Sequence, residues 1–172
     1  MIVVVMGVSG VGKTTIGVRL AERLGLPFVE GDRFHPPANI AKMSSGVPLD
    51  DEDRRPWLEA LATELDRARR AGSGIVLVCS ALRRSYRDIL RHGHDDVVFL
   101  FLAGDKTLLG ERLAARRGHF MPPGLLDSQF AALEPPGPDE RAVRVEVGGA
   151  LEETVAAALA ALERVPPKQN RS

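Results

Sequence analysis

The chain of 172 residues carries 23 basic and 23 acidic residues, so its formal net charge is zero, and 44% of its residues are hydrophobic. This balance excludes the overall basic surface that is typical of proteins that bind nucleic acid or membranes. The length suits one folded domain with its own core, which we expect to span residues 1–165, followed by a flexible tail at 166–172. The single cysteine, Cys79, excludes a disulfide framework and a cysteine-rich zinc site.

The apolar opening MIVVVMG is too short to cross a bilayer and carries no basic leader segment. No other stretch of the chain is a candidate targeting signal. We therefore expect a cytoplasmic protein that binds neither membranes nor nucleic acid.

Apolar stretches rich in β-branched residues alternate with stretches of helical periodicity along the chain. We expect strands at residues 1–6, 26–30, 74–80, 97–102 and 142–147. The first, third and fourth are continuous apolar runs, as expected for strands covered on both faces of a parallel sheet. Apolar spacing predicts helices around 16–24, 58–68 and 151–162, and Gly25 and Gly72 are placed to end the first two. This alternation predicts an α/β fold with a mainly parallel sheet.

The stretch GVSGVGKT matches the phosphate-loop pattern G-x-x-x-x-G-K-[ST], between a predicted strand and a predicted helix. Its glycines let the backbone curl so that successive N–H groups point at phosphate oxygens. We expect Lys13 to reach the β- and γ-phosphates of ATP, and the Thr14 hydroxyl to bind Mg²⁺. The residues expected to bind the nucleotide in this loop are Gly7, Ser9, Gly10, Val11, Gly12, Lys13, Thr14 and Thr15.

A phosphate loop alone does not separate a small-molecule kinase from a GTPase or an ATPase motor. The chain leaves little length for motor machinery after the loop. It also lacks the N-K-x-D segment that reads guanine, since its only asparagines are Asn39 and Asn170. These features favour a small-molecule kinase.

Residues 31–56 interrupt the alternation and are rich in glycine, proline and charge, with a short helix expected near 37–44. They follow the second predicted strand, and ligands of α/β sheets bind beyond the carboxyl ends of the strands. We therefore expect this insertion to bind the phosphate acceptor. Asp32 is placed to accept the proton of an attacking hydroxyl or to hold a magnesium-bound water, although it also fits a turn aspartate. His35 fits a substrate contact and an ordered turn equally well.

The charged stretch DDEDRRPW at residues 50–57 begins the next predicted helix. Asp50 or Asp51 suits the N-cap of this helix. Arg54 fits either a substrate contact or the charged first turn.

The third predicted strand is followed by CSALRRSYR at residues 79–87. Ser80 and Arg83 stand at the carboxyl end of that strand and are candidates for the acceptor site. Arg84 and Arg87 also fit a capped and solvated helix start.

Residues 117–138 form a second proline-rich insertion, which we expect to act as a mobile lid with a short helix in it. Arg112 and Arg116 are four residues apart and share the helix face that leads into it. Arginines on a closing lid neutralise charge on a transferring phosphoryl group while water is excluded. His119 stands at the start of the insertion, and the histidines show no metal-ligand pattern supported by the cysteine.

Four stretches form a recognisable set between residue 5 and about residue 136: MGVSGVGKTT, GDRFHPPANIAKMSSGVPLDDEDRRPWL, CSALRRSYRDILR and RRGHFMPPGLLDSQFAALEPP. In motif, order and spacing, this set resembles the small P-loop gluconokinase family. The phosphate loop is generic, whereas HPxxNxxKM, DxDRxPWL and GHFMxxxLLxSQFxxLE are specific to the resemblance.

This resemblance implies transfer of the γ-phosphate of ATP to the 6-hydroxyl of D-gluconate, with ATP and Mg²⁺ as cofactors. It implies a three-layer fold related to shikimate and nucleoside-monophosphate kinases, with a five-stranded parallel sheet, helices on both faces, a mobile lid and a homodimer. The catalytic residues would be Lys13, Asp32 and Arg116, and the nucleotide would also contact Arg112 and Arg116. The substrate-binding residues would be Asp32, His35, Lys42, Arg54, Ser80, Arg83 and His119.

Two small departures from the family pattern stand out. Glu30 occupies the first position of a segment that usually reads D-G-D, and Arg33 stands where an apolar or aromatic residue is more usual. No hydrophobic strand ends in the acidic residue of a standard Walker B motif, so the Mg²⁺ ligands beyond Thr14 stay open.

Two alternatives are kept. One is a kinase of another small hydroxy acid, such as shikimate, which would need a D-x-D after the second strand and a three-glycine acceptor loop. This chain has only the pair Gly148 and Gly149 near its end. A nucleotide-binding regulator without turnover belongs to a different class. The residues that argue against it are the intact Lys13, Thr14, Asp32 and Arg116.

Overall fold

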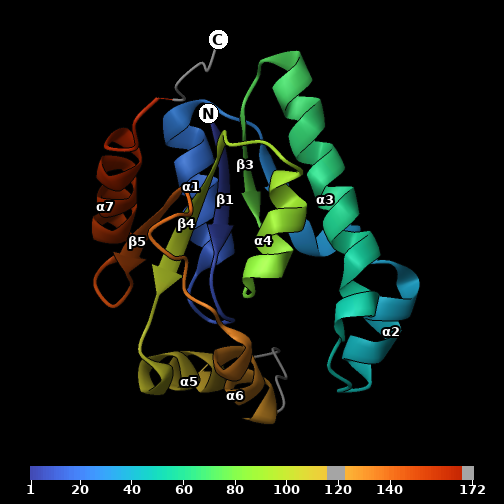
Figure 1. Cartoon of the computed structure of the whole chain (residues 1–172). Coiled ribbons are helices and arrows are strands. Elements are labelled where there is room, and N and C mark those ends of the chain that lie inside the picture. The colour runs from blue at the N-terminus through green and yellow to red at the C-terminus, as the bar shows by residue number, and fades with distance from the viewer. Residues whose placement is uncertain (116–122, 168–172) are drawn as a thin grey trace.

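The computed structural model describes residues 1–115 and 123–167, and its strands form one sheet (Figure 1). The strand order is β2-β3-β1-β4-β5, and every neighbouring pair is parallel. The strands are β1 (Ile2–Met6), β2 (Phe28–Glu30), β3 (Ile75–Val78), β4 (Val97–Ala103) and β5 (Ala142–Glu146). The predicted α/β class with a five-stranded parallel sheet is therefore confirmed.

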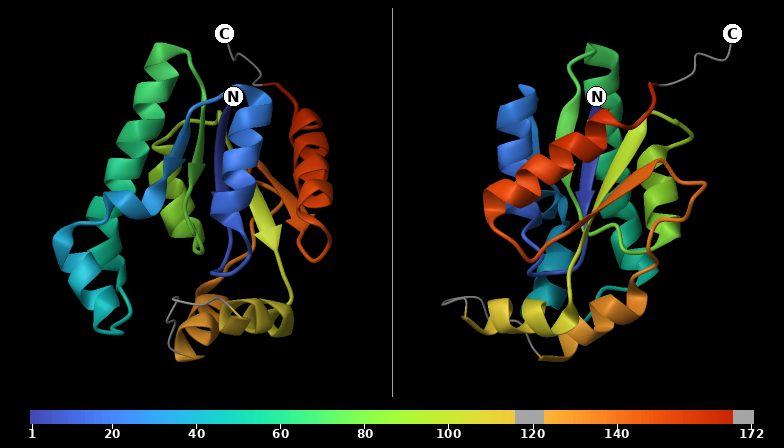
Figure 2. Two further views of the ribbon diagram at one scale, coloured as in Figure 1. Left: turned by 180° about the vertical axis from the view of Figure 1, so that it is seen from behind. Right: turned by 90° about the vertical axis from the view of Figure 1, so that its left-hand side faces the viewer.

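Helices cover both faces of this sheet (Figure 2). Those in the described part of the chain are α1 (Lys13–Leu24), α2 (Pro37–Ser44), α3 (Asp51–Ala71), α4 (Arg84–Arg91), α5 (Lys106–Ala115), α6 (Pro123–Ala132) and α7 (Leu151–Glu163). Apolar residues of α1 and α7 pack on one face, and those of α3 and α4 pack on the other. This arrangement gives the three layers that the resemblance implies.

The central strand β1 shows why its sequence is apolar throughout. Val3 and Val5 face the layer of α1 and α7, whereas Ile2, Val4 and Met6 face the layer of α3 and α4. Because side chains alternate between the faces of a strand, a strand covered on both sides has no polar positions.

Local signals set the ends of the helices. Asp50 is the N-cap of α3: its side chain accepts the N–H of Asp53, whose carboxylate accepts the N–H of Asp50 in return. Gly25 and Gly72 follow α1 and α3 in the left-handed conformation, each with a φ of 65°. The helix ends expected from the sequence are thus present.

The helices of the two insertions, α2 and α6, lie at the carboxyl edge of the sheet. In Figures 1 and 2 all strands point toward the end of the molecule that carries α2, α5 and α6. The predicted short helix of the first insertion is α2, and that of the second is α6. Within the described ranges, no helix has the length and apolar character that crossing a membrane requires.

Candidate active site

The phosphate loop between β1 and α1 is a tight turn that depends on its glycines. Gly10 and Gly12 adopt φ angles of 84° and 96°, which residues with a Cβ rarely adopt. A Cβ at Gly7 would lie 2.7 Å from the carbonyl oxygen of Leu102, so a side chain does not fit against β4. The Gly7 N–H donates to the carbonyl of Ser80 across 3.2 Å and joins the loop to the end of β3. The backbone therefore has the curl that a phosphate cradle needs.

Positive charge converges on this loop. Helix α1 begins at Lys13, so the positive end of its dipole faces the loop. Lys13 Nζ donates to the carbonyl of Val8 across 3.0 Å, which draws the ammonium group back over the loop. The side chain of Val11 is buried, so only its backbone is available to a ligand. Thr15 is exposed on the first turn of α1. The loop thus fits a polyphosphate.

Thr14 faces a residue to which the sequence assigned no role. Its hydroxyl donates to Glu30 Oε2 across 2.5 Å, and Glu30 is the last residue of β2. A hydroxyl and a carboxylate are hard oxygen ligands, and Mg²⁺ usually takes one or two protein carboxylates or hydroxyls beside phosphates and water. The pair therefore fits a magnesium–nucleotide site. The signal in the sequence was the acidic residue that ends the second strand.

Asp32 lies in the 3₁₀ turn Gly31–Phe34 that directly follows β2, and its side chain is exposed. The turn rests on β3, since a Cβ at Gly31 would lie 2.2 Å from the carbonyl oxygen of Val78. Trp57 Nε1 donates to the carbonyl of Gly31 across 2.8 Å and holds the turn from α3. These contacts place Asp32 at the carboxyl edge of the sheet.

Cys79 directly follows β3, and charged residues of the predicted site affect the pKa of its buried thiol. Burial raises the pKa of Cys79 to about 12, and the charges of Asp32, Lys13 and Arg54 also act on it. Electrostatic effects of this kind weaken with distance. Charges from three separate segments therefore act on the carboxyl end of β3.

His35 is half-buried and stacks on Trp57, with ring centroids 4.0 Å apart. Asn39 Nδ2 donates to the carbonyl of Asp53 across 2.9 Å, which fixes the orientation of the amide, and lies 3.2 Å from His35 Nδ1. Because an amide nitrogen only donates, Nδ1 is the acceptor and the ring proton is assigned to Nε2. Burial, with a smaller contribution from Arg54, lowers the pKa of His35 to about 4. His35 is thus a neutral ring that donates through Nε2.

Lys42, predicted as a substrate contact, already has a protein partner. Its ammonium group lies 2.7 Å from Asp53 Oδ2, and this hydrogen bond raises the pKa of Lys42 above its ordinary value. Asp53 is the same residue that closes the capping box with Asp50. Lys42 therefore joins α2 to the first turn of α3, whatever else it contacts.

Arg54 is oriented by Tyr86. The guanidinium carbon lies 5.4 Å from the centroid of the Tyr86 ring, and Nη1 lies 3.5 Å from the Tyr86 hydroxyl. That hydroxyl donates to Asp51 Oδ1 across 2.6 Å, and burial raises the pKa of Tyr86. The sequence did not single out Tyr86, because its partners lie on another helix.

The loop after β3 and the helix that follows it contain two predicted acceptor-site residues and one arginine whose environment differs from the prediction. Ser80 is partly buried, and Arg83 is the exposed N-cap residue of α4. Arg84 is exposed, as a solvated helix start requires. Arg87 is fully buried and pairs with Glu140 through Nε at 2.7 Å and Nη2 at 3.0 Å. The solvated interpretation of Arg87 is wrong, because the chain that leads into β5 packs against α4 and brings Glu140 to the guanidinium.

Helices α5 and α6 pack on the phosphate loop. The Leu113 side chain of α5 lies 3.0 Å from the position of a Cβ at Gly10, and the neighbouring Arg112 is partly buried. From α6, Gln129 forms two hydrogen bonds with Ser9. Two predicted site residues lie outside the described residues, Arg116 and His119.

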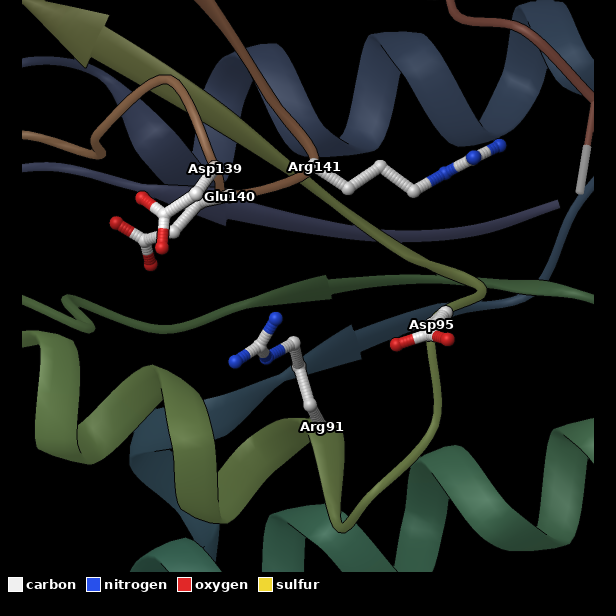
Figure 3. A pocket seen from close by; sticks show the side chains of 5 residues that line it. All are labelled: Arg91, Asp95, Asp139, Glu140 and Arg141. Carbon is white, nitrogen blue, oxygen red and sulfur yellow. The ribbon is translucent and has the colours of Figure 1, made fainter.

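A separate charged pocket lies between α4 and the chain that leads into β5 (Figure 3). Figure 3 shows Arg91 extending from α4 into the space between the loop of Asp139 and Glu140 and the turn of Asp95. The residues that line it are Arg91, Asp95, Asp139, Glu140 and Arg141. None of these five is a residue predicted for catalysis or binding, so the pocket is separate from the predicted nucleotide site.

The chain is similar to gluconokinases of several organisms. A family model described as an AAA domain matches residues 2–136. The chain is 54% identical over 142 residues to a gluconokinase of Gluconobacter oxydans, a match that covers 83% of this chain and 80% of that protein. It is 42% identical over 164 residues to the thermoresistant gluconokinase of Escherichia coli, which covers 95% of this chain and 94% of that one.

Solved structures agree with these relatives. A gluconokinase from Sinorhizobium meliloti superposes with a TM-score of 0.87 at 50% identity, and the match covers 95% of this chain and 91% of that chain. A shikimate kinase from Aquifex aeolicus superposes with a TM-score of 0.60 at 16% identity over 95% of this chain and 96% of that chain, which is a likeness of fold alone. The chain therefore belongs to the gluconokinase family.

Proposed function

We propose that this protein transfers the γ-phosphate of ATP to the 6-hydroxyl of D-gluconate, giving 6-phospho-D-gluconate and ADP. The observation that carries the proposal is that the phosphate loop and the turn of Asp32 both contact the end of β3: the Gly7 N–H donates to the carbonyl of Ser80, and Gly31 packs against the carbonyl of Val78. This arrangement supports a phosphate loop and an acidic group at one edge of the sheet, and the charge of Arg54 acts there as well. The gluconokinases of Gluconobacter oxydans and Escherichia coli support gluconate as the acceptor.

In the proposed reaction the 6-hydroxyl oxygen attacks the γ-phosphorus while the bond between that phosphorus and ADP breaks. Asp32 accepts the proton that the hydroxyl loses. Lys13 and the N–H groups of the loop offset the charge of the β- and γ-phosphates. Arg112 and Arg116 are proposed to add positive charge from α5 and the lid, with closure excluding water from the reacting groups.

Mg²⁺ is proposed to be held by Thr14 and Glu30 together with phosphate oxygens. When bound, it supplies charge neutralisation and orients the β- and γ-phosphates. Glu30 joins the proposed site because its carboxylate is the hydrogen-bond partner of the Thr14 hydroxyl.

Gluconate offers one carboxylate and several hydroxyls to the protein. Arg54 and Arg83 are proposed to bind the carboxylate, since a guanidinium suits two parallel hydrogen bonds to it. Ser80 and the Nε2–H of His35 are proposed to bind hydroxyls, because both are neutral donors. The remaining proposed substrate contacts are Lys42 and His119.

The experiment is a coupled assay of ADP formation across gluconate, shikimate, other sugar acids and nucleoside monophosphates. We expect the highest kcat/KM with gluconate. Equal or better turnover of another acceptor would overturn the proposed substrate. Tight ATP binding without turnover of any acceptor would favour a nucleotide-binding regulator instead.

We also propose that the protein is a homodimer of the cytoplasm, as the family resemblance implies. Light scattering on the purified full chain measures the mass in solution directly. A mass equal to that of one chain, 18.6 kDa, would exclude the dimer.

A further inference from the structure

The side-chain amide of Gln129 joins α6 to the phosphate loop. Its Oε1 accepts the backbone N–H of Ser9 across 2.6 Å, and its Nε2 donates to Ser9 Oγ across 2.8 Å. The two residues are 120 positions apart in the chain, and both are partly buried. Because both ends of the amide bind one residue, they hold that residue in a single orientation.

The chemistry of an amide is well matched to this position. A backbone N–H only donates, so the atom that faces the nitrogen of Ser9 is the amide oxygen, and the amide nitrogen then faces the hydroxyl. A carboxylate of the same length would accept the N–H as well. It would, however, place a negative charge beside a loop whose N–H groups and lysine suit phosphate.

The chain that follows Gln129 is fixed to the loop after β3. The N–H of Glu134, just beyond the end of α6, donates to the carbonyl of Leu82 across 2.8 Å. The same carbonyl and that of Ala81 accept Arg87 Nη1 at 3.2 Å and 2.9 Å. Arg87 is in turn paired with the buried carboxylate of Glu140. The helix end that carries Gln129 is thus hydrogen-bonded to the loop after β3, on the acceptor side of the site.

We propose that Gln129 is a positioning residue for phosphoryl transfer, which acts through Ser9 to set the phosphate loop at a fixed distance from the loop after β3. The proposal rests on the proposed kinase function, because it concerns the alignment of the ATP loop with the acceptor. An error of about 1 Å in such an alignment costs on the order of a hundredfold in rate. Loss of the amide should therefore lower kcat more than it raises the KM for gluconate.

The test is a double-mutant cycle on the full chain. Gln129→Met keeps the length and bulk of the side chain but lacks both hydrogen-bonding groups, and Ser9→Ala removes only the hydroxyl. Ser128→Ala is the matched control, since Ser128 is exposed on the same helix and its hydroxyl bonds within α6. For each variant we would measure kcat, the KM for ATP and for gluconate, the affinity for ADP, and the Tm.

We expect Gln129→Met to lower kcat at least about tenfold with little change in the KM for gluconate. Ser9→Ala should lower kcat in the wild type but have little further effect on kcat in the Gln129→Met variant, because the effects of substitutions at contacting residues are not additive. A folded Gln129→Met protein with the kcat of the wild type would overturn the proposal. So would full additivity of the two losses, since Gln129 would then act without the Ser9 hydroxyl that its amide nitrogen binds.

Two further measurements keep the inference testable. If Gln129→Met does not fold, Gln129→Glu replaces it. That variant keeps an acceptor for the Ser9 N–H and should raise the KM for ATP through its charge, and an unchanged KM would count against the proposal. If the wild type does not phosphorylate gluconate, the proposed function is wrong, but the affinity for ADP still tests Gln129. We expect Gln129→Met to weaken ADP binding about three- to tenfold, and equal affinity would overturn the proposal.

Discussion

The hydroxyl of Thr14 donates to Glu30 Oε2 across 2.5 Å, so the first turn of α1 and the last residue of β2 share one hydrogen bond. Glu30 thus brings a carboxylate from the end of β2 to the phosphate loop, next to the turn that carries Asp32.

Replacing Glu30 with Gln tests the proposed role of its carboxylate. The amide keeps the size of the side chain but removes its charge, and Mg²⁺ prefers charged oxygen ligands. We expect the concentration of Mg²⁺ that gives half-maximal rate to rise about tenfold, measured by magnesium titration at saturating ATP. Glu59→Gln, an exposed acid on α3, is the control. An unchanged magnesium dependence would remove Glu30 from the site.

Replacing Asp32 with Asn tests the proposed base. An amide has no place for the proton of the 6-hydroxyl, so kcat should fall about 10²- to 10⁴-fold. The KM for ATP should change far less, because Asp32 follows β2 on the acceptor side. Steady-state kinetics at saturating gluconate separates the two constants, and a near-normal kcat would exclude the role. Lys13→Ala, in the same assay, should abolish turnover.

The stability of the protein should depend on pH through His35. Its pKa is about 4 in the folded protein against an ordinary value of 6.5, so the unfolded chain binds more protons between these values. The contribution of His35 to stability is then fully present above pH 6.5 and is lost as the pH falls toward 4. Urea unfolding near pH 7 and near pH 5 should show a larger loss for the wild type than for His35→Gln. Parallel losses in the two proteins would contradict the lowered pKa.

The buried pair Arg87 and Glu140 should matter more for stability than the nearby exposed pair Arg84 and Asp139. The side chains of the first pair are 1% and 2% exposed, and those of the second are 45% and 60% exposed. Glu140→Gln leaves the guanidinium of Arg87 buried without a counter-charge, which we expect to cost about 3–5 kcal/mol in the free energy of unfolding. Asp139→Asn should change it little, because exposed pairs contribute little. Equal effects in urea unfolding would contradict the difference in burial.

Much of the fold was predictable because its causes are local in the sequence. The unbroken apolar run of β1 follows from helices on both faces of the sheet, and Gly72 and Asp50 mark the ends of α3 through their own backbone and side-chain preferences. The phosphate loop was predictable for the same reason, since its glycines and Lys13 are consecutive in the chain. Asp32 was predictable as a position, because it directly follows a strand.

The contacts that surround these residues were not predictable, because they join distant parts of the chain. Ser9 and Gln129 are 120 positions apart, Arg87 and Glu140 are 53 apart, and Thr14 and Glu30 are 16 apart. The neutral state of His35 likewise depends on burial against Trp57 and on the nearby Arg54. The sequence by itself therefore determined the parallel sheet, the phosphate loop and the segments that surround the site. Only the tertiary structure decided which side chains meet there, because hydrogen-bond partners and burial are set when the helices pack on the sheet.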